Sequence, residues 1–402
     1  MISITRLLCD LESYGDELRY RADMTSSSRR PIVVWNVSRR CNLSCIHCYS
    51  NSANAEYANE LTTDQAKAMI LDLEEFRVPV LLFSGGEPLM RKDLFELNAF
   101  AHAHHIRTVI STNGTLITKQ AAKQIKNAGI DYVGVSLDGI GSRNDMFRGR
   151  QGAFALALEG IRNLVAVRQK VGLRFTITRH NYPDIRDIFK LVEDEAIDRV
   201  CFYHLVYSGR GSSMTEDDLP RADMRHCIDS ICDWAESMFK RGIHKEVLTV
   251  DNHADAVYVY LRALKNDPRK AQEILTLLRY NKGNASGIAI ANVDNQGNVH
   301  ADQFWQSHTF GNVTKRKFGD IWMDTSDDIM NKLKNRASHI KGRCSRCKYL
   351  DLCNANFRAR AEAVYGDMWQ QDPACYLSDE EIGITEETEY EIPRIPAKAP
   401  QG

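Results

Sequence analysis

The sequence has 402 residues, 43% of them hydrophobic, and a formal net charge of -1 at pH 7. A chain of this length and composition is expected to bury a large core and to divide into two or three domains. The balanced charge excludes a global field that would attract nucleic acid or a membrane surface, and apolar runs of only strand length predict no membrane span.

The amino-terminal segment and the cysteine content predict a cytoplasmic protein. The first twenty residues carry acidic side chains and no long apolar stretch, so they do not predict a secretory signal. Eleven cysteines without an export signal indicate reduced thiols. Four of them are isolated along the chain and are expected to serve packing: Cys9, Cys201, Cys227 and Cys232.

Residues 31–206 alternate between apolar runs of strand character and longer helical patterns. Continuous apolar strands separated by helices predict an α/β fold with a parallel sheet, and the pattern allows an open sheet or a partial barrel. In either arrangement, functional sites form at the carboxyl ends of the strands. The predicted strands are 31–37, 80–83, 108–111, 132–137, 173–178 and 200–206, and the predicted helices are 62–76, 94–104, 119–127, 154–169 and 185–193.

Three cysteines follow the first predicted strand in the segment SRRCNLSCIHCYS. Cys41, Cys45 and Cys48 have the spacing C-x3-C-x2-C, and three thiolates this close can hold three irons of a cubane cluster. Because iron–sulfur clusters usually take four thiolates, the fourth iron is left open for a small molecule. The alternatives are a loop of buried cysteines or a zinc site completed by His47, although zinc sites usually show paired ligand knuckles.

Polar or glycine-rich motifs follow the next three strands. The sequence SGGEP occupies 84–88, and its two glycines allow a backbone turn to approach a ligand closely. STNGT at 111–115 offers hydroxyl and amide groups suited to a ribose. SLDG at 136–139 contains Asp138, which can act as a catalytic base or cap a turn; turn preferences favour the cap. Motifs at four consecutive strand ends predict one shared site.

Together these motifs resemble those of the radical S-adenosylmethionine (SAM) enzymes, over about residues 31–210. The resemblance implies a partial (β/α)6 TIM-like barrel and a 4Fe-4S cluster whose open iron binds SAM. It also implies cleavage of SAM to methionine and a 5′-deoxyadenosyl radical that abstracts hydrogen from an unactivated carbon. The implied cluster ligands are Cys41, Cys45 and Cys48, and the implied SAM-binding residues are Gly85, Gly86, Glu87, Pro88, Ser111, Asn113, Ser136 and Arg148.

A second group of cysteines lies near the carboxyl terminus. Cys344, Cys347 and Cys353 form C-x2-C-x5-C, and Cys375 follows. Four thiolates suit either an iron–sulfur cluster or zinc, and the spacing alone leaves both open. The segment resembles the SPASM or twitch extension of radical SAM enzymes. Because Asp302 and Phe357 stand where a second auxiliary cluster would need cysteines, the resemblance implies one auxiliary 4Fe-4S cluster, with a role in electron transfer or substrate positioning.

The predicted domain organisation follows from these patterns. A β-hairpin is expected within 287–312, with its turn at 294–297 and Gly297 at a turn position that favours positive φ. The tail is acidic and then rich in proline, alanine and lysine, which predicts mobility. The predicted units are an N-terminal segment at 1–30, the radical SAM partial barrel at 31–214, a helical connector at 215–285, the C-terminal iron–sulfur (SPASM/twitch-like) extension at 286–377 and a flexible tail at 378–402.

A narrower resemblance is to radical SAM enzymes of alternative haem and haem d1 biosynthesis. It is carried by YHLVYSGRG at 203–211, DNHADAV at 251–257, GNASGIAIANVDNQGNVH at 283–300 and DPACYLSDEEIGI at 372–384. One branch of this group removes acetates from 12,18-didecarboxysiroheme to give iron-coproporphyrin III, and the other removes propionates on the way to haem d1. The element DELRY at 16–20 favours the deacetylase branch. The implied partners are this iron tetrapyrrole and a low-potential flavodoxin or ferredoxin.

Residues suited to an anionic, flat, iron-containing substrate are scattered through the strand-end loops. Arginine forks bind carboxylates well, histidines can ligate iron or move protons, and aromatic rings can stack on a macrocycle. Each of these residues alone is equally compatible with a surface or packing role. The candidates are Arg143, Arg148, Arg150, Arg179, Arg210, His204, His253, His300, His308, Tyr203, Phe304 and Trp305, with His204, Asp138 and Tyr203 as catalytic candidates.

The expected reaction begins with hydrogen abstraction near the side chain that is lost. Fragmentation releases that side chain, and the ring radical is quenched by an electron and a proton, with the auxiliary cluster as a candidate for the redox step. Two other functions remain open. A SPASM-type enzyme can modify a peptide, although only about 30 residues precede the first strand where such enzymes often carry a peptide-recognition domain. A non-catalytic tetrapyrrole or iron–sulfur carrier is the third, which an intact cysteine triad beside Gly-Gly-Glu-Pro disfavours.

Overall fold

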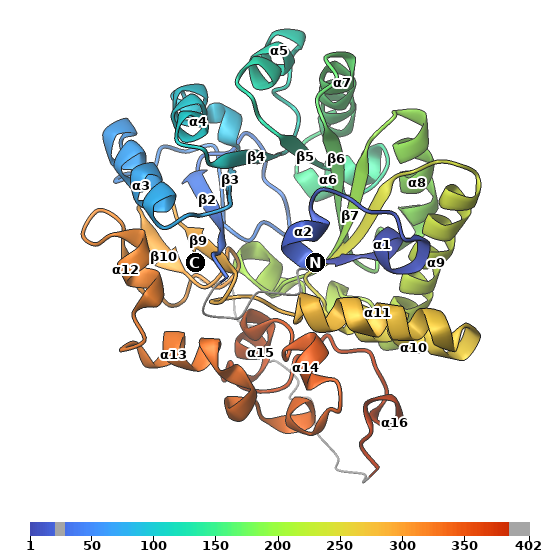
Figure 1. Ribbon diagram of the computed structural model, residues 1–402. Helices are drawn as coiled ribbons and strands as arrows, with labels where there is room; N and C mark the ends of the chain where they lie inside the picture. The colour runs from blue at the N-terminus through green and yellow to red at the C-terminus, as the bar shows by residue number, and fades with distance from the viewer. Residues whose placement is uncertain (21–28, 386–402) are drawn as a thin grey trace.

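The computed structural model describes residues 1–20 and 29–385. In these residues eleven strands form one curved sheet, in the order β1-β8-β7-β6-β5-β4-β3-β2-β9-β10-β11 (Figure 1). The strands are β1 (Ile2–Ser3), β2 (Ile32–Ser38), β3 (Val80–Gly85), β4 (Arg107–Thr112), β5 (Tyr132–Ser136), β6 (Val171–Ile177), β7 (Arg199–His204), β8 (Glu246–Val250), β9 (Ile290–Val293), β10 (Asn298–His300) and β11 (Gly311–Asn312).

The six predicted strands are β2 to β7, and each pairs in parallel with the next. Helices α3, α4, α5, α7 and α8 lie around the outside of these strands, which confirms the α/β class (Figure 1). Because both faces are covered, apolar side chains such as Val133, Leu173 and Phe202 are fully buried. Parallel pairing directs the carboxyl ends of all these strands toward one end of the partial barrel.

The helices match the predicted pattern through the barrel, and α3 begins at a capping box formed by Thr62 and Gln65. The α-helices are α1 (Ile4–Cys9), α2 (Asp16–Arg19), α3 (Thr63–Glu75), α4 (Leu94–Ala103), α5 (Lys119–Asn127), α6 (Ser142–Arg148), α7 (Ala153–Ala166), α8 (Ile185–Asp194), α9 (Arg221–Lys240), α10 (Ala254–Asn266), α11 (Pro268–Asn281), α12 (Phe318–Met323), α13 (Asp328–Lys334), α14 (Leu350–Cys353), α15 (Arg358–Tyr365) and α16 (Asp379–Ile382). Short 3-10 helices occur at Pro88–Met90, Tyr182–Asp184, Gly209–Ser213, Thr215–Asp217, Arg336–His339 and Gly342–Arg346.

The segment predicted as a helical connector contains a strand. Strand β8, with the sequence EVLTV, pairs in parallel with β7 and is buried along its whole length. Strand β1 pairs antiparallel with β8 at the sheet edge, so the amino-terminal residues are part of the same sheet. A buried run of five residues between two long helices takes the strand conformation because an open edge of the parallel sheet is available to pair with it.

The predicted hairpin at 287–312 forms as β9 and β10, and Gly297 has a φ of 87° at its turn. Strand β9 also pairs in parallel with β2, with Val33 opposite Ala291. The cysteine-rich carboxyl-terminal part therefore continues the sheet at the β2 edge, beside the strand that leads into the cysteine triad (Figure 1).

The segment predicted as a flexible tail from 378 onward is ordered at its start. Residues 378–385 contain α16, which has a capping box at Ser378 and Glu381 and buries Ile382 and Ile384. An ion pair of 2.7 Å joins Glu381 to Arg225 on α9. Apolar burial and this ion pair hold the segment against the domain, whereas residues 386–402 lie outside the described residues. In the described part of the chain, no helix is long and apolar enough to cross a membrane.

Candidate functional site

A cavity opens at the carboxyl ends of the parallel strands, and we call it the inner cavity. Residues from the ends of β2 through β8 contribute to it, so the topology gathers motifs that are far apart in the sequence. The residues that line this cavity include Cys41, Cys45, Cys48, His47, Tyr49, Gly85, Gly86, Ser111, Asn113, Ser136, Arg148, Arg174, Tyr203, His204, Arg210, Asp251 and Phe304.

The cysteine triad lies in the loop after β2, with all three thiols on the inner cavity. Hydrogen-bond donors surround the sulfurs: the Leu43 amide lies 3.4 Å from the Cys41 Sγ, and the Arg148 guanidinium lies 3.7 Å from the Cys45 Sγ. The Asn113 side-chain amide contacts the Cys41 Sγ at 3.9 Å. Donors placed around thiolates stabilise negative charge, so this donor set fits an anionic iron–sulfur cluster.

The two glycines after β3 are required by a close approach to the cysteine loop. Gly85 has a φ of 117°, and a Cβ there would lie 2.4 Å from the Ser38 carbonyl. A Cβ on Gly86 would lie 2.2 Å from the Arg40 carbonyl, and the Gly86 amide donates to the Ser38 carbonyl at 2.8 Å. The glycines thus fix the wall of the cavity beside the triad.

Glu87 and Pro88 were predicted to bind a cofactor, and neither lines the inner cavity. The fully buried Glu87 carboxylate accepts hydrogen bonds from Thr112 Oγ1 and the Asn113 amide, both at 2.8 Å. Burial raises the pKa of this carboxyl, and the bound donors oppose the rise. Pro88 begins a 3-10 helix. Glu87 therefore ties the loop after β3 to the loop after β4.

Asp138 is fully buried behind the cavity and contacts two nitrogen-bearing side chains that line it. Its Oδ2 lies 2.5 Å from the Arg148 Nη2 and 3.2 Å from the His47 Nε2. Burial alone would raise the pKa of the Asp138 carboxyl, but the Arg148 guanidinium and His47 hold it well below its usual range. The ionised carboxylate orients Arg148 toward the cysteine triad. The sequence analysis considered Asp138 only as a catalytic base or as the cap of a turn, and it did not predict this contact.

Arg174 on β6, and Tyr203 and His204 on β7, also line the inner cavity. The Arg174 guanidinium on β6 donates to the Ser111 Oγ at 2.8 Å and lies 5.6 Å from the centre of the Tyr203 ring. His204 is buried, and its Nε2 lies 2.8 Å from the Asp255 Oδ2. Arg174 was missed by the sequence analysis; an arginine inside the apolar run VGLRFTI is the signal that identifies it.

The remaining sequence candidates divide into those that reach the inner cavity and those that do not. Arg210 reaches it and donates to the Cys45 carbonyl at 2.7 Å. Arg143 and Arg179 instead form ion pairs with Asp184 and Asp217, and Arg150 is exposed. His253, His300 and His308 lie outside the inner cavity, where His300 and His308 pair with Asp294 and Asp327.

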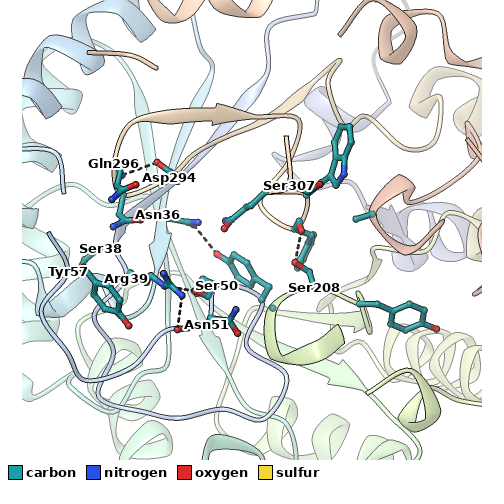
Figure 2. Close-up of a pocket in the computed structure, with 18 of the residues that line it drawn as sticks. Asn36, Ser38, Arg39, Ser50, Asn51, Tyr57, Ser208, Asp294, Gln296 and Ser307 are labelled. Carbon is teal, nitrogen blue, oxygen red and sulfur yellow. Dashed lines mark hydrogen bonds between the residues drawn. The ribbon is translucent and has the colours of Figure 1, made fainter. Parts of the chain in front are cut away.

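A second cavity of about 560 Å³ adjoins the first, and we call it the outer cavity (Figure 2). Figure 2 shows Arg39 donating to the main chain at Ser50 and Asn51 on its wall. Tyr49 and Phe304 line both cavities, and their rings meet edge to face with centroids 5.2 Å apart. The outer cavity is lined by amide and aromatic residues that include Asn36, Asn51, Tyr57, Tyr207, Asn295, Gln296, Phe304 and Trp305, with Asp294 and Glu362.

The four carboxyl-terminal cysteines line one small apolar cavity beside α10 and α14. Arg343 donates to the Cys375 Sγ at 3.3 Å, and the Tyr349 amide donates to the Cys347 Sγ at 3.4 Å. Cys344 and Cys353 complete the set. Four cysteines on one cavity, with hydrogen-bond donors on two of the sulfurs, are a donor set that would suit an iron–sulfur cluster or zinc.

The sequence comparisons agree with this site. A family model described as the Radical SAM superfamily matches residues 35–192. The chain is 52% identical over 398 residues to the Fe-coproporphyrin III synthase of Methanosarcina barkeri, covering 96% of this chain and all of that protein. It is 41% identical over 379 residues to the pre-heme d1 synthase of Dinoroseobacter shibae, covering 93% of each.

Solved structures share the fold at low sequence identity. Streptococcus suis SuiB bound to S-adenosylmethionine superposes with a TM-score of 0.66 at 17% identity, over 87% of this chain and 78% of that one. Native anSMEcpe with bound AdoMet gives a TM-score of 0.66 at 17% identity, over 86% and 93% of the two chains. The chain thus shares the fold of these two structures, and the family model and the full-length relatives show that it belongs to the radical SAM superfamily.

Within that superfamily, the chain is a radical SAM enzyme closely related to Fe-coproporphyrin III synthase, in the haem-biosynthesis group that also contains pre-heme d1 synthase. Membership of the superfamily implies a 4Fe-4S cluster and SAM as cofactors.

Proposed function

We propose that this chain removes acetate side chains from 12,18-didecarboxysiroheme and releases iron-coproporphyrin III. The observation that carries the proposal is the 52% identity with an Fe-coproporphyrin III synthase over that protein's whole length. The pre-heme d1 synthase match is eleven points lower, 52% against 41%. The similarity covers 96% of this chain and all of that relative.

The cofactor site in this proposal is the inner cavity. Cys41, Cys45 and Cys48 would hold the 4Fe-4S cluster, which together with bound SAM supplies the 5′-deoxyadenosyl radical. The Arg148 guanidinium, oriented by Asp138, would bind the SAM carboxylate through a charge-assisted hydrogen bond. Gly85, Gly86, Ser111, Asn113 and Ser136 line the same space and would contact the methionyl and ribose groups.

The outer cavity is the proposed site of the macrocycle. Its volume of about 560 Å³ is within the size range of small-ligand and cofactor sites. The aromatic rings of Tyr49 and Phe304 lie where the outer cavity meets the inner cavity. Part of a flat substrate would pack against these rings and meet the SAM site there. Arg174 and Arg210 line the inner cavity, and they would bind substrate carboxylates that reach through this boundary.

The carboxyl-terminal cysteines are proposed to hold one auxiliary 4Fe-4S cluster. The full ligand set is Cys344, Cys347, Cys353 and Cys375. Asp302 and Phe357 occupy the positions where a second auxiliary cluster would require cysteines, and both are buried in other contacts. A low-potential flavodoxin or ferredoxin is the proposed electron donor.

The deciding experiment is product analysis. The reconstituted protein is incubated without air with dithionite, SAM and 12,18-didecarboxysiroheme, and products are identified by mass spectrometry. We expect 5′-deoxyadenosine, acetate and iron-coproporphyrin III, and none of these from the Cys45→Ala variant. Loss of propionates would assign the chain to the haem d1 reaction of its second relative. Unchanged tetrapyrrole in the presence of active SAM cleavage would reject both reactions.

A further inference from the structure

The strand that the sequence analysis missed, β8, places a carboxyl group on the inner cavity. Asp251 follows β8 directly and lies next to the end of β7, because Val250 is paired with Tyr203. It lines the inner cavity and is only 6% exposed. Its φ of 68° is in the left-handed region, which aspartate adopts more readily than most residues other than glycine.

One oxygen of the Asp251 side chain is left without a hydrogen-bond donor. This atom, Oδ2, is buried and has no hydrogen-bond partner among the described residues. The Arg360 Nη2 donates to the Asp251 main-chain carbonyl at 2.7 Å, and the charge of Arg360 is balanced by Asp372 at 2.9 Å. The packed elements place the Met1 amine, His204 and Asp302 around the carboxyl, with Arg174 and Tyr203 on the same cavity.

This environment favours the protonated form of the Asp251 carboxyl. Burial raises the pKa of the carboxyl to about 7, and the Met1 amine and Arg360 moderate the rise. The other candidate acids are less suitable. Asp138 is ionised beside Arg148, and burial raises the pKa of Tyr203 far above its usual range. The His204 Nε2 is engaged by Asp255.

The proposed reaction requires one proton for each acetate released. Removal of a hydrogen atom from the ring carbon beside the acetate-bearing carbon leaves a radical there. Cleavage of the bond to the side chain forms a ring double bond and a carboxymethyl radical. One electron from the low-potential iron–sulfur or flavin donor and one proton convert that radical to acetate, which balances atoms and electrons.

We propose that Asp251 is the general acid that protonates the departing side chain as it is reduced to acetate. The inference rests on the proposed function and adds the proton donor, which sequence resemblance did not identify. The carboxyl lines the same cavity as the three cysteines, next to Tyr203 and His204 at the end of β7. After each turnover the Asp251 carboxylate regains a proton from solvent through the cavity.

The test compares Asp251→Asn with the wild-type holoenzyme under the assay conditions above. We expect 5′-deoxyadenosine formation to stay within about threefold of wild type. Acetate and iron-coproporphyrin III formed per 5′-deoxyadenosine should fall by about 100-fold, as expected for loss of a general acid. Freeze-quench EPR should show an accumulated organic radical. In wild type, the rate of acetate formation should decline as pH rises past about 7. The Asp251→Asn variant should not show this decline at high pH.

Two further variants and a spectrum keep the result interpretable. Asp251→Glu retains an acid and should recover a large part of the coupling with the same alkaline limb, even if the amide variant fails to fold. Asp218→Asn is the matched control, because burial also raises the pKa of the Asp218 carboxyl. The Asp218 oxygens accept hydrogen bonds from the Tyr207 hydroxyl and the Leu219 amide, and Asp218 lines neither cavity. This variant should therefore keep the wild-type coupling. Infrared difference spectra should show a protonated carboxyl band that titrates near pH 7 in wild type and is absent from Asp251→Asn.

Wild-type coupling and an unchanged pH profile in Asp251→Asn would overturn the inference and leave the proposed function intact. Failure of the wild-type enzyme to release acetate would instead reject the proposed function. A pH-independent infrared spectrum in wild type would also reject Asp251 as the acid.

Discussion

The Arg148 Nη2 lies 2.5 Å from the Asp138 Oδ2, and the two side chains are 9% and 0% exposed. The same oxygen lies 3.2 Å from the His47 Nε2. One buried carboxylate therefore positions two nitrogen-bearing side chains on the wall of the inner cavity. Because the carboxylate itself does not line the cavity, we expect Asp138 to act by positioning Arg148.

Replacing Asp138 by asparagine should weaken SAM binding more than it changes substrate binding. Arg148 would lose its counter-charge and its fixed orientation, so the dissociation constant for SAM should rise by about tenfold. The buried guanidinium left without its partner should lower the free energy of unfolding by about 3–5 kcal/mol. Calorimetric titration with SAM and urea denaturation measure the two effects.

The matched control for this prediction is Asp194→Asn, which breaks the exposed ion pair with Lys190. Exposed pairs contribute little to stability, so both SAM affinity and the urea midpoint should be unchanged in that variant. Wild-type SAM affinity in Asp138→Asn would show that Arg148 does not depend on this carboxylate for its role.

Removing the Phe304 ring should affect the tetrapyrrole and spare SAM. Phe304 packs edge to face with Tyr49 and with Phe357, and it lines both the inner and the outer cavity. In Phe304→Ala the KM for the tetrapyrrole should rise by roughly tenfold, which corresponds to the loss of about 1.4 kcal/mol of aromatic contact. Steady-state kinetics with each substrate varied in turn make the measurement.

Tyr49→Phe provides the control for Phe304→Ala, because it keeps the ring and removes the hydroxyl that contacts Asn36 and Ser84. It should retain the wild-type KM for the tetrapyrrole. Equal KM values in Phe304→Ala and wild type would mean that the macrocycle binds away from the boundary between the two cavities.

Much of the site could be predicted because its chemistry is local in the sequence. The spacing of Cys41, Cys45 and Cys48 lies within one loop, and the close approach that requires Gly85 and Gly86 is signalled by the glycine pair itself. Apolar strands that alternate with helices predicted β2 to β7 because burial on both faces leaves a continuous apolar pattern.

The rest depends on contacts between segments far apart in the chain. Strand β8 is a five-residue run between two long helices, so its pattern of apolar residues could not be distinguished from the helical pattern on either side. Asp251, which follows β8, was missed for the same reason. Arg174 is placed on the cavity by its register opposite Ser136 and Cys201. The pairing of β9 with β2, which brings Phe304 next to Tyr49, has no local signature.

Loss of one carboxyl-terminal cysteine should remove iron without abolishing SAM cleavage. Cys375 contacts Arg343 and completes the four-thiol cavity. Two 4Fe-4S clusters hold eight irons per chain. The iron content of the Cys375→Ser variant should therefore fall toward about four irons per chain, while 5′-deoxyadenosine formation persists. Iron and zinc analysis with EPR of the reduced protein make the measurement. Cys9→Ser, outside both cysteine groups, should keep the wild-type iron content, and zinc in place of iron at this site would contradict the prediction.

The unusual carboxyl of Asp251 should also appear in the pH dependence of stability. Its pKa is raised from 3.8 to about 7 on folding, so the native state holds the proton that the unfolded state has lost between these values. Stability contributed by the neutral carboxyl is therefore fully present below about pH 4 and is lost as pH rises through about 7. A shift of this size corresponds to an upper bound on the order of 4 kcal/mol in the free energy of unfolding.

Urea denaturation of wild type and Asp251→Asn from pH 5 to 8.5 should show the variant gaining stability relative to wild type as pH rises, because the amide cannot ionise. Parallel stability curves for the two proteins would show that Asp251 is already ionised below neutral pH in the folded state.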